Sequence, residues 1–172
     1  FIDDSPNLSM MEIRAKARRL KQRHDLKLIV IDYLQLMSSG KKVENRQQEV
    51  SEFSRQIKLM AKELDIPVVA ISQLNRSPEQ RADKKPMLSD LRESGSIEQD
   101  ADVVILLHRE DMYDKQNRPG EADLHVAKHR NGPTDTIKLS AQLHFARFSN
   151  MAKSAGAGAD WTTSRSTPDD EF

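Results

Sequence analysis

Two polar side chains, Asp32 and Gln73, each follow a run of apolar residues that is typical of a buried strand. Asp32 comes directly after Leu28–Ile31, and Gln73 follows a strand predicted at Pro67–Ser72. The first run has four consecutive apolar residues, three of them β-branched, so we expect a strand buried on both faces within a parallel sheet. Because ligands of open α/β sheets bind at the carboxyl ends of the strands, both side chains would lie at the ligand edge.

An aspartate and a glutamine at this edge have the chemistry of a magnesium-nucleotide site. In P-loop nucleotide hydrolases an Asp at such a strand end holds the magnesium ion that bridges the phosphates, and an amide can orient the attacking water or the terminal phosphate. The alternative is structural, because many α/β strands end in Asp, and a strand-end Gln is common without any catalytic role. On spacing alone, both interpretations stay open.

Two cations, Lys128 and Arg130, precede the Gly132-Pro133 turn and have the same strand parity. Side chains two apart on a strand project to one side, so this pair could reach the phosphates of a neighbouring subunit as an arginine finger does. The alternative is a charged edge strand that discourages aggregation.

The longest irregular region is expected at Arg76–Asp100, and it contains Arg92, Glu93 and Gly95. Glycine allows a backbone to approach phosphate closely and arginine can pair with it, which is compatible with nucleic-acid binding. A flexible solvent loop is the alternative. The five histidines do not form a set with the spacing of metal ligands.

The elements that must position these residues can be predicted from periodicity and capping. Ser9 and Glu12 form a capping box at the start of a basic amphipathic helix, and a second helix is expected at about 47–64. A polar loop at Ser38–Arg46 separates the Asp32 strand from that helix. Four further strands are expected: one at Ala101–Leu107, one around the alternating Ala122, Leu124 and Val126, one around Ile137 and Leu139, and one around Leu143 and Phe145. The fold class is therefore α/β: a parallel sheet flanked by helices, with antiparallel strands added at its C-terminal edge.

Composition excludes several classes of protein. The 172 residues have a net charge of zero, no cysteine and 5% aromatic residues, which argues against a disulfide scaffold, a Cys-based metal site or an aromatic stacking platform. No apolar run is long enough for a membrane span and no signal peptide is recognisable, so we expect a cytoplasmic protein without membrane partners. Residues 152–172 lack periodicity and are expected to be a disordered tail after a single domain at 1–151.

Four segments, taken in order, resemble the bacterial replicative DNA helicases of the DnaB type. These segments are Val30–Leu36, Ala70–Arg76, Leu88–Asp102 and Lys128–Pro133, and the resemblance extends over roughly Phe1–Met151. It implies a RecA-like P-loop ATPase core in a homohexameric ring that encircles single-stranded DNA and unwinds the duplex at the replication fork. ATP and Mg²⁺ would be its cofactors, and primase, a helicase loader and the clamp loader its partners.

The resemblance also implies a role for each candidate residue. Asp32 matches the Walker B aspartate, which holds Mg²⁺ through water, and Gln73 matches the phosphate-sensing glutamine. Lys128 and Arg130 match the basic pair that reaches the neighbouring subunit's ATP. The residues matching the central-channel DNA loop are Arg92, Glu93 and Gly95, and Ser38–Arg46 matches the other channel-side loop.

The sequence departs from the family pattern in ways that limit the expected activity. Neither the Walker A loop nor the catalytic glutamate is present, and Asp135 stands where the family usually has Gly. We therefore expect an ATPase domain that is incomplete at the N-terminus and does not hydrolyse ATP by itself. A non-catalytic module that binds DNA or protein partners, and a recombinase-type ATPase, remain as alternatives.

Overall fold

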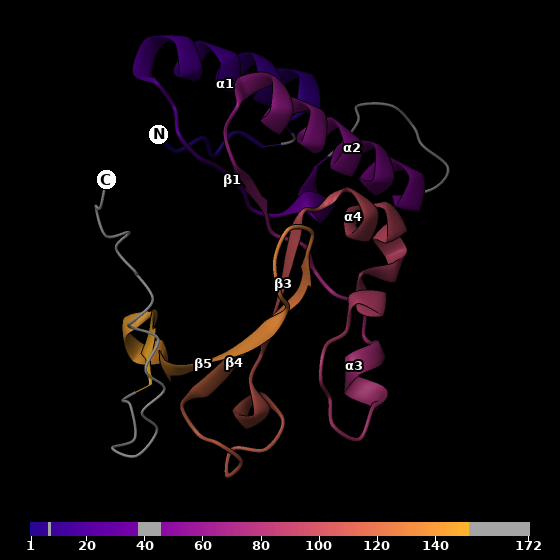
Figure 1. Cartoon of the computed structure of the whole chain (residues 1–172), viewed down its shortest axis with the longest axis vertical. Coiled ribbons are helices and arrows are strands. Elements are labelled where there is room, and N and C mark those ends of the chain that lie inside the picture. Colours follow the sequence, from indigo (N-terminus) through magenta and orange to yellow (C-terminus); the bar gives the residue numbers. More distant parts are fainter. Residues whose placement is uncertain (7, 38–45, 152–172) are drawn as a thin grey trace, which may run out of the picture.

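The computed structural model describes residues 1–6, 8–37 and 46–151, whose strands form two sheets. Strands β1 (Ile29–Ile31) and β2 (Val68–Ala70) pair in parallel, whereas the second sheet is antiparallel with the order β3-β4-β5-β6 (Figure 1). Its strands are β3 (Val103–His108), β4 (Glu121–His129), β5 (Asp135–Gln142) and β6 (Arg147–Asn150). The predicted α/β class with a parallel sheet and added antiparallel strands is confirmed. In detail, the added strands pair with β3 and not with the β1–β2 pair.

Two long helices cover one side of the parallel pair. Helix α1 (Met10–His24) begins at the predicted capping box, in which Ser9 Oγ accepts from the Glu12 amide and Glu12 accepts from the Ser9 amide. Helix α2 (Arg46–Leu64) buries the face that its periodicity predicted. The core they share with the first two strands includes Ala17, Ile31, Leu34, Phe53, Ile57, Met60 and Leu64.

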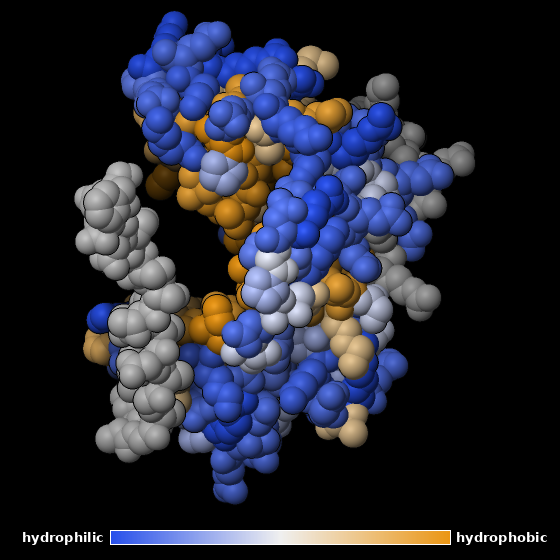
Figure 2. All heavy atoms as spheres, viewed as in Figure 1, coloured by the Kyte–Doolittle hydropathy of each residue, from blue (hydrophilic) through white to orange (hydrophobic). Residues whose placement is uncertain are grey.

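The other face of the parallel pair is exposed among the described residues. Val30 is 58% exposed although its neighbour Ile31 is 9% exposed, and Val69, which is in register with Val30, is 50% exposed. Side chains alternate across a strand, so α1 and α2 bury only every second residue. The prediction that this strand is buried on both faces is wrong for this part of the chain. Figure 2 shows hydrophobic residues lining the hollowed side of the molecule.

The predicted irregular region Arg76–Asp100 is largely helical, so that prediction was also wrong. It contains α3 (Ser77–Gln80), the 3-10 helix η2 (Leu88–Ser94) and α4 (Gly95–Asp100). Each is only one or two turns long, which is too short to produce a readable hydrophobic period.

The end of the antiparallel sheet differs from the prediction at one strand. The segment predicted as a strand at Leu143/Phe145 is a 3-10 turn, η4 (Leu143–Phe145), closed by Ala146 in the left-handed conformation with φ 48°. The last strand is β6, which follows this turn and pairs with β5. Two further 3-10 turns of three residues are η1 (Leu34–Leu36) and η3 (Glu110–Met112).

Two predictions fall outside the described residues: most of the polar loop Ser38–Arg46 and the tail 152–172. Among the helices that are described, none has both the length and the apolar character needed to cross a membrane.

Candidate functional site

Asp32 and Gln73 lie at the same edge of the parallel pair, as predicted. The register pairs Ile31 with Ala70, so the chain leaves both strands side by side. Two backbone hydrogen bonds continue the pairing beyond the strands: the Ile71 amide donates to the Ile31 carbonyl, and the Leu34 amide donates to the Ile71 carbonyl, each at 2.9 Å. Asp32 is exposed at this edge. A carboxylate and an amide residue thus follow adjacent strands at one edge of the sheet.

Gln35 connects the two segments and was not singled out from the sequence. Its Nε2 donates to Ser72 Oγ at 3.0 Å and to the Gln73 carbonyl at 3.3 Å, and its Oε1 accepts from the Gln73 amide at 3.2 Å. Both ends of one amide therefore hold the backbone at Gln73. The only sequence signal was that Gln35 is a polar residue between the apolar Leu34 and Leu36, shortly after the first strand.

The residues at this edge fit the metal and terminal-phosphate end of a nucleotide, but not the whole nucleotide. No group of three potential metal ligands from His, Cys, Asp and Glu occurs among the described residues. Mg²⁺ in nucleotide sites commonly takes one or two carboxylates and completes its shell with waters and phosphate oxygens, so Asp32 alone is a sufficient protein ligand. The sequence contains no glycine-rich loop of the Gly-x-x-x-x-Gly-Lys type to cradle the remaining phosphates.

The predicted cation pair, Lys128 and Arg130, converges on the C-terminal end of α4. Lys128 Nζ donates to the carbonyls of Glu98 at 2.5 Å and Gln99 at 3.2 Å, and Arg130 donates to the Gln99 carbonyl at 3.1 Å. Contact with one helix end agrees with their equal strand parity. Cations at this end also face the negative pole of the short helix.

The residue between them turns the other way, and the following glycine makes room for it. His129 Nδ1 lies 3.2 Å from the Pro133 carbonyl oxygen. A Cβ at Gly132 would lie 2.4 Å from His129 Cε1, so any larger residue would displace the ring. Gly132 therefore permits the tight turn that begins at Arg130, directly after β4.

The predicted DNA-contacting residues lie immediately before the same helix. Arg92 and Glu93 are in η2, and Gly95 is the first residue of α4. The side chains of residues 92–95 lie outside what the structure describes. The backbone nevertheless shows that α4 joins this segment directly to the carbonyls that hold Lys128 and Arg130.

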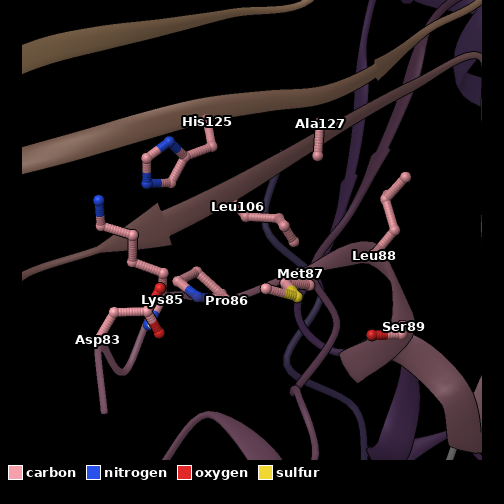
Figure 3. A pocket seen from close by; sticks show the side chains of 9 residues that line it. All are labelled: Asp83, Lys85, Pro86, Met87, Leu88, Ser89, Leu106, His125 and Ala127. Atoms are coloured by element: carbon pink, nitrogen blue, oxygen red, sulfur yellow. The ribbon is translucent and has the colours of Figure 1, made fainter. Parts of the chain in front are cut away.

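A separate cavity of about 490 Å³ lies between the segment 83–89 and the strands β3 and β4 (Figure 3). Its lining is mostly apolar and includes His125, but none of the predicted site residues. Near it, His108 is 3% exposed, and this burial lowers the pKa of its imidazole. His108 Nε2 and His125 Nε2 have no hydrogen-bond partner among the described residues.

Comparison with known proteins agrees with the resemblance. Residues 1–150 match the family described as DnaB-like helicase C terminal domain. The replicative DNA helicase DnaB of Mycobacterium leprae is 74% identical over 154 residues, which cover 89% of this chain and 26% of that protein. The replicative DNA helicase DnaC of Bacillus subtilis is 53% identical, with 89% of this chain and 34% of that protein covered.

Solved structures show the same relationship in three dimensions. The ATPase domain of G40P superposes with a TM-score of 0.80 at 44% identity, covering 84% of this chain and 52% of that domain. A DnaB-like replicative helicase, whose structure was solved together with a study of its interactions with primase, superposes with a TM-score of 0.84 at 43% identity. The match covers 88% of this chain and 37% of that helicase chain. These neighbours confirm the RecA-like fold, and the family match favours a helicase over a recombinase-type ATPase.

The chain spans between about a quarter and a third of the length of the curated relatives described above, and about half of the solved ATPase domain. Within that span the family model matches almost every described residue. The chain therefore belongs to the DnaB-like helicase C-terminal domain family.

Proposed function

We propose that this chain is part of a replicative DNA helicase that couples ATP hydrolysis to movement along single-stranded DNA. The observation that carries the proposal is the meeting of Asp32 and Gln73 at one sheet edge within a chain of this family. At that edge Asp32 would hold Mg²⁺ through water and Gln73 would contact the terminal phosphate or its attacking water. Magnesium would supply charge neutralisation at the phosphates when bound.

The rest of the nucleotide pocket comes from residues outside this chain. The sequence has no phosphate cradle, and the solved ATPase domain is about twice the matched length. The exposed row of Val30, Val69 and Ile71 supports this, because an apolar sheet face of this kind is normally covered by another layer of the fold. The active unit is then the complete protein, assembled as a homohexameric ring.

Lys128 and Arg130 act on the ATP of the neighbouring subunit in this proposal. Their anchorage at the end of α4 keeps two cations together, Lys128 near the end of β4 and Arg130 in the exposed turn that follows, and this supports a role for Arg130 across an interface. Single-stranded DNA would contact Arg92, Glu93 and Gly95. Primase is a proposed partner because a solved relative was studied with it, and a helicase loader and the clamp loader follow from the resemblance.

The decisive experiment is Arg130→Ala in the complete protein. ATP turnover should fall by roughly a thousandfold or more, since a trans arginine stabilises transition-state charge, while the Kd for nucleotide changes little. The control is Arg147→Ala, which removes an exposed arginine from β6 and should leave turnover unchanged.

Normal turnover in the Arg130→Ala protein would contradict the proposed role. If the wild-type complete protein binds DNA but hydrolyses no ATP, the alternative of a non-catalytic binding module is correct instead.

A further inference from the structure

Asp102, in the turn between α4 and β3, lies among three cations. It forms an ion pair with Lys58 of α2, and its Oδ1 lies 3.5 Å from Arg130 Nε. The ion pair with Lys58, followed by the charges of Arg130 and Lys128, lowers the pKa of the Asp102 carboxyl, so it stays ionised at neutral pH. A negative charge is therefore permanently placed beside the proposed trans-acting arginine.

Arg130 is held from several directions at this place. Its amide donates to the Asp102 carbonyl at 2.8 Å, one terminal nitrogen donates to the Gln99 carbonyl at 3.1 Å, and Nε faces the Asp102 carboxylate. A guanidinium has five N–H groups in a planar fork. With one edge of that fork engaged by its own subunit, the remaining N–H groups point in a fixed direction.

The ion pair between Arg130 and Asp102 contributes to orientation more than to stability. The Arg130 and Asp102 side chains are 50% and 56% exposed, and an ion pair this exposed adds little to the stability of the fold. The fold therefore does not depend on it. The orientation of the Arg130 guanidinium does depend on it, because without Asp102 the side chain keeps, among the described residues, only its hydrogen bond to the Gln99 carbonyl and gains rotational freedom about several bonds.

We propose that Asp102 is a positioning residue that orients the Arg130 guanidinium toward the neighbouring subunit's phosphates. This inference rests on the proposed function and adds a residue to it. Asp102 holds the Nε edge and Gln99 one terminal nitrogen, while the remaining N–H groups donate to phosphate oxygens, so the arginine approaches the nucleotide already aligned. Alignment of this kind lowers the barrier without adding ground-state affinity.

The test uses the complete hexameric helicase with saturating single-stranded DNA. Asp102→Asn should lower kcat by about tenfold or more, since small misplacements of a catalytic group are costly, while KM and the Kd for ATP stay within about twofold. Asp102→Glu should recover part of the loss. In an Arg130→Lys background, whose side chain lacks the planar fork, Asp102→Asn should cause little further loss.

Two matched controls separate positioning from structural support. Lys58→Met removes the other ion-pair partner of Asp102 but leaves Arg130 facing the carboxylate, so kcat should stay near the wild-type value. Asp65→Asn is the same isosteric change at an exposed residue with φ 50°, a conformation that Asn tolerates, and should have no effect.

Equal losses in Asp102→Asn and Lys58→Met would overturn the inference in favour of a structural role, and so would unchanged kcat in Asp102→Asn. Either result, with Arg130→Ala inactive, removes only this inference. An active Arg130→Ala protein would instead remove the trans-acting role of Arg130 on which this inference rests.

Discussion

Arg81 holds the carboxylate of Asp90 with both terminal nitrogens of its guanidinium. One of these contacts is 2.8 Å long, and the same carboxylate accepts from the Met87 amide at 2.7 Å. Asp90 is 2% exposed, which is unusual for a carboxylate. This pair joins α3 to η2, so it fixes the segment that leads into the proposed DNA-contacting residues.

Removal of one partner should loosen this segment. We expect Arg81→Met to destabilise it, because the Asp90 carboxylate, which is 2% exposed, would lose its charged partner. Hydrogen exchange of the amides in 81–91, measured in the complete protein, would detect this as lost protection. Arg147→Met is the control, and unchanged protection in Arg81→Met would contradict the prediction.

The same pair predicts a dependence on pH. The Arg81 ion pair is the main cause that keeps the pKa of the Asp90 carboxyl below its ordinary value. A lowered folded-state pKa stabilises the fold above the unfolded-state value of about 4, and this stabilisation is lost as the pH falls through the folded-state pKa. Protection of 81–91 should therefore decline below about pH 4 in the wild type. In Arg81→Met this acid-dependent component should be missing.

Gln35→Met should impair turnover without unfolding the protein. Methionine is similar in volume but cannot make the hydrogen bonds to Ser72 and Gln73, so Gln73 loses its fixed backbone position. We expect kcat of the complete protein to fall by about tenfold, with the Kd for ATP little changed. Gln116→Met, on an exposed turn, is the matched control. A kcat equal to that of the control would show that Gln35 has no positioning role.

Met60→Ala and Leu59→Ala form a pair of neighbouring substitutions on α2 with opposite expectations. Met60 is fully buried at 0% exposure, whereas Leu59 is 49% exposed. Truncation of Met60 should cost about 2–5 kcal/mol through lost burial and a cavity, and truncation of Leu59 less than about 1 kcal/mol. Hydrogen exchange of α2 amides in the complete protein measures both. Similar effects would mean that another layer covers Leu59 in the assembled protein.

The sequence predicted those elements whose signal lies within their own residues. The Ser9–Glu12 capping box and the spacing from Val50 to Leu64 are such signals, and both helices form where expected. The meeting of Asp32 with Gln73 also followed from local patterns, because parallel strands end at one edge. The exposure of Val30 could not be predicted from local patterns. An apolar strand has the same composition whether or not a second layer of the fold lies over it.

Polar contacts between distant residues were the main features that the sequence did not reveal. Asp123 is 5% exposed on β4, at a position where the alternation of Ala122, Leu124 and Val126 predicted solvent exposure. It is buried because Arg118 donates to both of its carboxylate oxygens at 2.7 and 2.8 Å. Arg118 lies in a charged turn that is typical of solvent exposure. Gln35 and Asp102 are similar cases, because their importance depends on a partner from another element.

Helix α4 has six residues and is therefore only about 9 Å long. A helix of less than two turns moves as one rigid unit. A shift imposed on its first residue, Gly95, should therefore move its last carbonyls by a similar amount. Those carbonyls hold Lys128 and Arg130. If DNA contacts Gly95 as proposed, a displacement that it causes there would therefore reach Lys128 and Arg130 at the other end of α4 without any rearrangement of the sheets.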